Sequence, residues 1–213
     1  MFKSKIEPFD LFQIDCFQNL ILSILSSQDI DPCIFGSKWP WTFYKEKSTD
    51  EIFYQSFVNE KVLMEFCGYK LIEYNIDTSS IEDLRNLVKN YPIIINVDQF
   101  YISHHYPDIY NTKHGPHSLI IEAYDNSNLR FFAIGVLPKY KGWISTEEIL
   151  KSLNSNHVES KKVYWLEKQY EVGNLEDKVK TSFINSLAES ETFENFDFFQ
   201  MNEMYDIFKR LST

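Results

Sequence analysis

Glycine and proline are scarce in this sequence, with 6 Gly and 7 Pro in the whole chain. This scarcity excludes collagen-like and low-complexity architectures, which are rich in one or both. Basic residues are also outnumbered, because 31 Asp and Glu stand against 21 Lys and Arg and the net charge is −10. Such a chain repels a phosphate backbone unless a basic patch is segregated, and the densest basic spots, 139–141 and 161–162, are short. We therefore expect no nucleic-acid partner.

Long hydrophobic runs and export signals are also lacking. No apolar run reaches the roughly 18 residues that a membrane helix needs, and residues 1–8 have no apolar central region of the kind found in signal peptides. The three cysteines, Cys16, Cys33 and Cys67, are widely spaced and form no C-x-x-C pair. We expect reduced thiols, a cytoplasmic location and no membrane partner, and we expect neither a metal nor a cofactor.

The chain does have ample material for a hydrophobic core. Aromatic residues make up 16% of it and apolar residues 44%, which is enough to offset the entropy cost of ordering the backbone. The length fits one domain of generous size. We predict an α/β fold of the α+β kind, in which residues 1–155 form a catalytic-type domain. Residues 156–213 are expected to add a strand and a helical extension to the same domain.

Local patterns predict most of the helices and strands. Residues 16–25 are apolar nearly all round, which indicates a buried helix, and Asp15 stands where its N-cap is expected. The turn signal at 125–128 separates two strand-like segments, 116–124 and 129–137, and predicts a hairpin. The other predicted elements are a helix from 79 or 80 to 91, a strand over 92–98, a helix from the capping box of Ser145 and Glu148 to Leu153, a strand segment over 158–172 and two helices over 175–211.

Three stretches have less regular patterns. Residues 33–57 are aromatic and poorly periodic, which predicts a loop-rich segment packed over the first helix or forming the rim of a pocket. Residues 62–76 alternate well enough for one or two strands around Gly68, with Cys67 buried in mid-strand. Residues 99–115 form a loop rich in tyrosine and histidine. Its adjacent histidines, 104 and 105, either line a pocket or face solvent.

A cysteine that opens a buried helix and a histidine far downstream on a strand form the one arrangement suited to catalysis. The N–H groups and the dipole at a helix N-terminus stabilise a thiolate, which favours Cys16 as a nucleophile. The same N–H groups can contribute to an oxyanion hole, and a histidine beside the thiol completes a nucleophile–base pair. The alternative is a core cysteine, because cysteine is among the most often buried residue types.

Four short blocks follow one another in a recognisable order. They are DCFQN at 15–19, NVDQFY at 96–101, HGPHSLIIEAYD at 114–125 and GWISTEEIL at 142–150. These blocks resemble the N-terminal domain of butirosin biosynthesis protein H and its relatives, and the resemblance spans residues 10–155.

The resemblance implies a papain-like cysteine protease-type core, with the Cys16 helix packed on an antiparallel sheet that carries His117. It implies that Cys16 is the nucleophile and His117 the general base of an acyltransferase. The acyl group would pass from an acyl or peptidyl carrier protein to a small amine acceptor in antibiotic or other specialised-metabolite biosynthesis, including nonribosomal peptide synthesis. Two alternatives stay open: a cysteine hydrolase (peptidase, amidase or thioesterase) and a non-catalytic scaffold on the same fold.

The third member of a papain-like site is missing from its expected place. An Asp or Asn that orients the histidine usually lies on the following strand, but the residues around Val136, opposite His117, are apolar. Asp125 lies eight residues beyond His117, which is roughly 26 Å along a strand. The site is therefore a Cys–His dyad, or Asp98 orients His117, or activity has been lost. Gln13 is the candidate oxyanion donor.

Histidines three residues apart on one strand face opposite sides, so His114 and His117 cannot both point at one thiol. We expect His114 to shape the loop instead. The candidates for lining a substrate pocket are Trp39, Trp41, Phe100, Tyr101 and His114.

Overall fold

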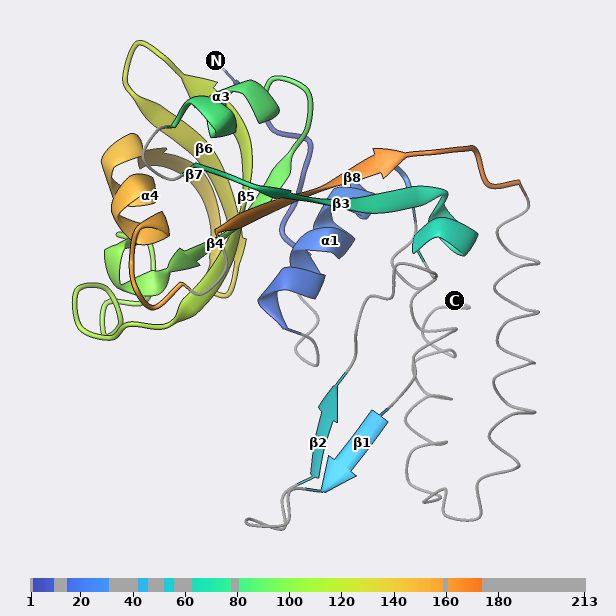
Figure 1. Ribbon diagram of the computed structural model, residues 1–213, viewed down its shortest axis with the longest axis horizontal. Helices are drawn as coiled ribbons and strands as arrows, with labels where there is room; N and C mark the ends of the chain where they lie inside the picture. The colour runs from blue at the N-terminus through green and yellow to red at the C-terminus, as the bar shows by residue number, and fades with distance from the viewer. Residues whose placement is uncertain are drawn as a thin grey trace.

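A computed structural model describes residues 2–9, 15–30, 63–77, 81–158 and 161–173, together with the backbone of 42–45 and 52–55. Its centre is an open six-stranded antiparallel sheet with the strand order β3-β8-β4-β5-β6-β7 (Figure 1). The mixed class expected from the sequence is confirmed at this level, as a sheet with a few helices. The bounds of the elements are α1 Cys16–Ser26, β1 Thr42–Lys45, β2 Ile52–Gln55, the π-helix η2 Leu63–Cys67, β3 Tyr69–Asn75, α3 Glu82–Leu87, β4 Ile93–Asp98, the 3-10 helix η3 Gln99–Tyr101, β5 Pro116–Asp125, β6 Arg130–Val136, β7 Lys139–Ser145, α4 Thr146–Leu153 and β8 Lys162–Lys168.

The helix α1 begins where the sequence predicts. The carboxylate of Asp15 accepts a hydrogen bond from the N–H of Gln18 at 2.8 Å, which satisfies one of the free donors of the first turn. The apolar residues that follow are buried on all sides of the helix, as a segment without a polar face requires.

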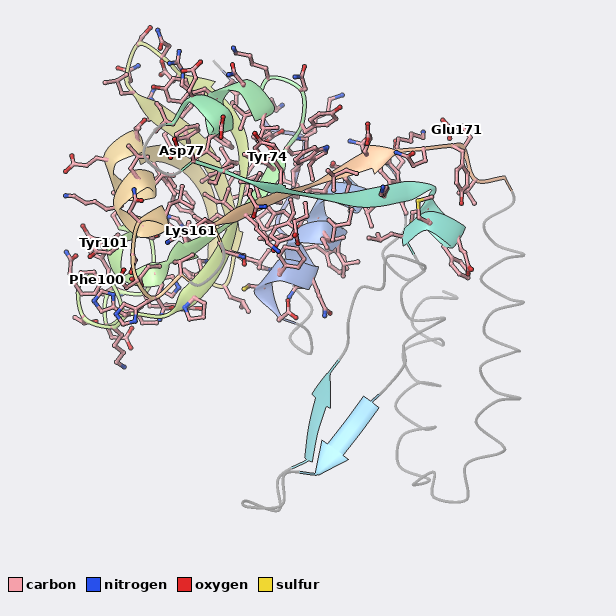
Figure 2. The ribbon with its side chains drawn as sticks, viewed as in Figure 1. Tyr74, Asp77, Phe100, Tyr101, Lys161 and Glu171 are labelled. Carbon is pink, nitrogen blue, oxygen red and sulfur yellow. The ribbon has the colours of Figure 1, made fainter. Side chains whose placement is uncertain are left out.

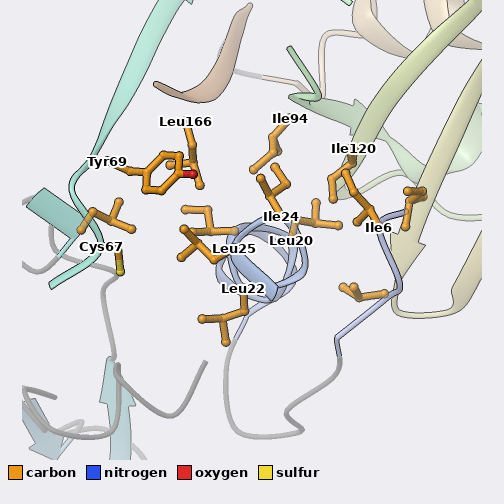
Figure 3. Close-up of a cluster of buried hydrophobic side chains, with 14 of the residues drawn as sticks. Ile6, Leu20, Leu22, Ile24, Leu25, Cys67, Tyr69, Ile94, Ile120 and Leu166 are labelled. Atoms are coloured by element: carbon orange, nitrogen blue, oxygen red, sulfur yellow. The ribbon is translucent and has the colours of Figure 1, made fainter. Parts of the chain in front are cut away.

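The sheet separates two hydrophobic clusters. One lies between α1 and the face of β4, β5 and β6 that carries Ile94 and Ile120. Figure 3 shows this cluster around α1, with Leu166 of β8 and Tyr69 of β3 beside it. The second cluster lies on the opposite face, where Leu119 of β5 packs with residues of α3 and α4 such as Leu153. Alternate residues of the central strands therefore enter different cores.

The β5–β6 hairpin is confirmed, and its register locates the positions opposite His117. Ile120 pairs with Ile134, and continuing this antiparallel register places Leu137 opposite His117. No acid stands there, as the sequence suggested. Asp125 lies at the far end of β5, where it accepts a hydrogen bond from Arg130 Nε at 3.0 Å.

Several elements differ from their predictions. Cys67 is buried as expected, but it ends the π-helix η2 rather than lying in mid-strand, and the single strand β3 follows Gly68, within the one or two strands predicted there. The segment at 33–57 contains the antiparallel pair β1 and β2. The strand β7 was not predicted, and α3 is shorter than the helix expected over 79–91. The helices expected at 175–211 lie outside the described residues. The strand β8 lies between β3 and β4 in the sheet.

Candidate active site

Cys16 is the first residue of α1 and is half-buried against the sheet. Its partner there is Ser118 of β5, with which the thiol forms a hydrogen bond. The hydroxyl of Ser118 donates in turn to Oδ1 of Asn96 on β4 at 2.9 Å. Because a hydroxyl has only one proton, the thiol of Cys16 donates to Ser118 and the chain of donors ends on the amide oxygen of Asn96. A neutral amide does not take up the proton, so this chain holds the thiol without activating it.

The surroundings of Cys16 favour the thiol over the thiolate. Burial raises the pKa of Cys16 most strongly, and the nearby charge of Asp15 raises it further. Once the thiol loses its proton, the hydroxyl of Ser118 can turn to donate to the sulfur, and this hydrogen bond and those from the backbone N–H groups of Ser118 and Phe17 stabilise the thiolate and lower the pKa. The net effect is a raised pKa. The sulfur nevertheless has anion-stabilising N–H groups from two separate elements, α1 and β5.

His117 lies on the other face of the sheet. It pairs with Val97, a residue of the core on the α4 side, whereas its neighbour Ser118 faces α1. The His117 side chain is 5% exposed and its ring packs edge-on against His105 with the centroids 4.9 Å apart. Successive residues of a strand point to opposite faces, which explains why Ser118 rather than His117 meets Cys16.

The expected hydrogen-bonded pair of Cys16 and His117 is therefore not formed. Both residues lie in the described part of the chain, no hydrogen bond joins them there, and Nε2 of His117 is buried without any partner. The resemblance to papain-like sites predicted a dyad, and the structure corrects this prediction by placing the two side chains on different faces. Leu137, opposite His117, offers no carboxylate that could orient the ring.

His117 belongs instead to a group of three histidines on the α4 side, which we call the histidine cluster: His104, His105 and His117. Burial lowers the pKa of His117 to about 3, with the charges of His105 and His104 acting in the same direction. Burial also lowers the pKa of His104 to about 4, and the ring of His104 stacks on Tyr140 with centroids 3.5 Å apart. Neither ring nitrogen of His104 has a partner among the described residues. At neutral pH these buried rings are uncharged and accept protons poorly.

Asp98 orients His114 rather than His117. The carboxylate Oδ2 lies 2.6 Å from Nδ1 of His114, and the Asp98 side chain is fully buried. Ser155 donates to the same oxygen at 2.5 Å, and the N–H groups of Phe100 and Gly115 donate to Oδ1 at 3.1 Å each. Burial raises the pKa of Asp98, but these four hydrogen bonds outweigh it and hold the pKa below its ordinary value. The alternative that Asp98 orients His117 is not what the structure shows, because the carboxylate contacts His114 instead.

The ring of His114 lies between two other rings. Phe100 stacks on it with centroids 4.1 Å apart and planes 12° apart, and His157 stacks on it at 4.2 Å and 17°. Tyr101 approaches the edge of the same ring at 6.0 Å. Figure 2 shows Phe100 and Tyr101 side by side at the end of the molecule opposite Glu171. Of the predicted pocket residues, the structure thus groups Phe100, Tyr101 and His114.

The remaining predicted site residues, Gln13, Trp39 and Trp41, lie outside the described residues, as does Cys33. Sequence reasoning missed Asn96 and Ser118. Their signal was a polar residue inside each of two largely apolar strands, at positions that pair with each other. His157 is exposed, and its ring stacks on that of His114. In the described ranges, no group of three His, Cys, Asp or Glu side chains is arranged to hold a metal ion.

No protein-family model and no curated protein matches this chain. None of the helices in the described part has the length and apolar character needed to cross a bilayer.

Proposed function

We propose that this protein is a cysteine acyltransferase of papain-like architecture, in which Cys16 carries the acyl group as a thioester. The supporting observation is the position of Cys16 at the N-terminus of α1. There its sulfur is half-buried and receives N–H groups from both α1 and β5. Such a position stabilises an anion on the sulfur or on an adjacent carbonyl oxygen, which the thioester reaction needs.

In the proposed reaction, the thiol of Cys16 loses its proton and attacks the carbonyl carbon of an acyl thioester on a carrier protein. The new carbon–sulfur bond forms on Cys16, and the carrier thiolate leaves and takes up a proton. An amine then attacks the enzyme thioester, forms an amide and releases the thiol of Cys16. If water takes the place of the amine, the same intermediate gives a hydrolase.

A non-catalytic binding protein on the same fold is the second candidate. Two observations favour it: the proton of Cys16 is held by a chain that ends on Asn96, and Leu137 stands where an orienting acid would lie. Both candidates share the same architecture, so they differ only in whether Cys16 becomes acylated.

Intact-protein mass spectrometry with S-acyl-N-acetylcysteamine thioesters of short and medium chain length tests the proposal. We expect one acyl adduct that maps to Cys16, that is lost in Cys16→Ser and that persists in Cys67→Ala. Cys67 is the matched control because it is also a thiol packed against the α1 core. Folded wild-type protein that gains no adduct on Cys16 from any of these donors overturns the transferase and supports the binding protein.

A further inference from the structure

Ser118 and Asn96 are polar side chains on a face of the sheet that is otherwise apolar beside them. They pair with each other across β4 and β5, whereas the next pair on the same face, Ile94 and Ile120, is fully buried in the α1 core. Ser118 is 5% exposed, so its hydroxyl is nearly withdrawn from water. Burying a hydroxyl costs free energy unless it is hydrogen-bonded, and a cysteine packs well against apolar groups alone. The polar pair therefore serves something other than the packing of Cys16.

The hydroxyl of Ser118 lies between two partners but carries only one proton. In the resting protein it donates to Oδ1 of Asn96 at 2.9 Å and accepts from the thiol of Cys16. Once the thiol has ionised, it has no proton left to donate, and the strongest hydrogen bond open to Ser118 is a donation to the negatively charged sulfur. Rotation of the hydroxyl about its Cβ–Oγ bond makes this exchange without any movement of the strand.

We propose that Ser118 is the catalytic residue that stabilises the Cys16 thiolate, and that Asn96 is the positioning residue that keeps the hydroxyl turned away from the sulfur until the thiol ionises. This inference rests on the proposed function. During acylation the hydroxyl donates to the attacking thiolate, and in the second half of the reaction it donates to the thiolate that leaves as the amine forms the amide. Ser118 keeps its own proton in both steps, and the proton of the thiol passes to water. Only the direction of the Ser118 hydrogen bond changes.

The two residues should therefore act on the thiolate in opposite directions. Removing the hydroxyl of Ser118 deletes a donor to the thiolate, whereas removing the amide of Asn96 deletes the competitor for that donor. A purely structural role gives no such opposition, because looser packing around Cys16 moves its ionisation in the same direction in both variants. Among the described residues, the charge that acts on Cys16 is that of Asp15, which raises its pKa and is retained in every variant.

Labelling of Cys16 by iodoacetamide from about pH 7 to about pH 11 measures this ionisation, with peptide mapping to separate Cys16 from the other thiols. Ser118→Ala removes the hydroxyl, Ser118→Thr keeps it, and Asn96→Val replaces the amide by an apolar side chain suited to a strand. Asn96→Ala is the second variant at that position. Ser152→Ala is the matched control, because it deletes another buried hydroxyl, one that donates to the backbone oxygen of Asp98 on the α4 side. Circular dichroism establishes that each protein is folded across the range.

We expect the labelling midpoint of Ser118→Ala to lie about one pH unit above that of wild type, because the thiolate loses a hydrogen bond. Asn96→Val and Asn96→Ala should shift the midpoint downward, while Ser118→Thr and Ser152→Ala should keep the wild-type value. At pH 7.5, Ser118→Ala should form the Cys16 adduct with S-acetyl-N-acetylcysteamine about threefold more slowly. Its thiolate fraction falls about tenfold, but a more basic thiolate is the better nucleophile and recovers part of the rate.

Two outcomes separate this inference from the proposed function. If wild-type protein gains the Cys16 adduct but the midpoint of Ser118→Ala is unchanged, or if the Asn96 variants shift in the same direction as Ser118→Ala, the roles of Ser118 and Asn96 are wrong and the proposed function stands. If wild-type protein gains no adduct on Cys16, the proposed function fails and the catalytic role of Ser118 fails with it, whatever the labelling midpoints are.

Discussion

Cys16 and Cys67 are both thiols beside the α1 core, but their surroundings differ in ways that labelling can measure. Cys16 is half-buried at a helix terminus, whereas Cys67 is 5% exposed and burial raises its pKa to about 12. We expect iodoacetamide to label Cys16 faster than Cys67 at pH 7. Because the pKa of Cys16 is also raised above the ordinary thiol value of 9.0, its labelling rate should still be climbing at pH 9. Peptide mapping across this range checks the prediction, and rapid labelling of Cys67 ahead of Cys16 would contradict it.

The histidine cluster makes stability depend on pH. The pKa of His117 falls from 6.5 to about 3 on folding and that of His104 falls to about 4. The unfolded chain therefore binds more protons than the folded chain between these values. The stabilisation is fully present above about pH 6.5 and is lost as the pH falls toward 4 and then 3. For the almost fully buried His117, the loss is on the order of several kcal/mol.

Replacing His117 by an apolar side chain should remove its share of this acid sensitivity. We expect His117→Leu to lose less stability than wild type between pH 7.5 and pH 4.5, measured by urea unfolding at both values. At pH 7.5 the change should be small, within about 1.5 kcal/mol, because a buried nitrogen without a partner is replaced by a group of similar size. Leu119→Met, on the same strand face but without a titratable group, should keep the wild-type pH dependence. An unchanged pH dependence in His117→Leu would rule out a protonation cost at this site.

The site could be predicted only in part from single residues. The sequence identified Cys16 at a helix start and the carboxylate of Asp98 at a strand end. It could not tell which face of β5 meets α1, because Leu119 and Ile120 are both apolar and each face of the strand is buried. Alternation therefore separates His117 from Ser118 but does not say which of them meets the thiol. That choice depends on how the helix docks on the sheet, which is a tertiary contact.

At the level of elements, the cap of α4 connects that helix to the loop that carries the histidines. Ser145 and Glu148 form the capping box that the sequence predicted, with the Ser145 hydroxyl accepting from the Glu148 N–H at 3.2 Å. Glu148 also accepts a hydrogen bond from the N–H of Ser103 at 3.1 Å. The side chain of Glu148 therefore caps the N-terminus of α4 and also holds the loop at Ser103.

Loss of the cap should be measurable by itself. We expect Ser145→Ala to lower the free energy of unfolding by about 1 kcal/mol, since the first turn loses an acceptor. Glu147→Gln is the neighbouring control: its exposed ion pair with Lys151 contributes at most a few tenths of a kcal/mol. Urea unfolding at pH 7.5 compares the two variants. A Ser145→Ala protein as stable as the control would show that the cap does not limit stability.

Elements with strong local signals were predicted well, and elements that depend on partners were not. The N-cap of Asp15 and the turn at 125–128 fix α1 and the β5–β6 hairpin from neighbouring residues alone. By contrast, β7 is an edge strand whose residues are mostly half-buried and show no clear alternation of buried and exposed positions. It is held as a strand by its pairing with β6. The π-helix before β3 has no periodic signature of its own, and Gly68 follows it with φ of 70°, a conformation that favours glycine.

At the scale of the molecule, the described residues centre on a six-stranded sheet that carries a hydrophobic core on each face. The central strands contribute alternate side chains to both cores, so neither face can open without moving the residues that pack on the other. The candidate site follows from this arrangement. Cys16 and Ser118 belong to the α1 face, and the histidine cluster belongs to the α4 face. Asp98, at the end of β4, accepts from Ser155, which follows α4, and so links the strand end to the α4 side.

This arrangement predicts one cooperative unfolding transition for both faces. Ile24→Val trims the α1 core and Ile149→Val trims the α4 core, at side chains that are 3% and 0% exposed. Each should cost about 0.5–1.5 kcal/mol, and the double variant should lose the sum to within about 0.5 kcal/mol because the two sites share no contact across the sheet. Circular dichroism and tryptophan fluorescence in urea should give one coincident transition for every variant. A biphasic curve in which Ile149→Val shifts one step and Ile24→Val shifts the other would mean that the two faces unfold independently. The shared strands would then not couple the α1 face, which carries Cys16, to the α4 face, which carries the histidine cluster.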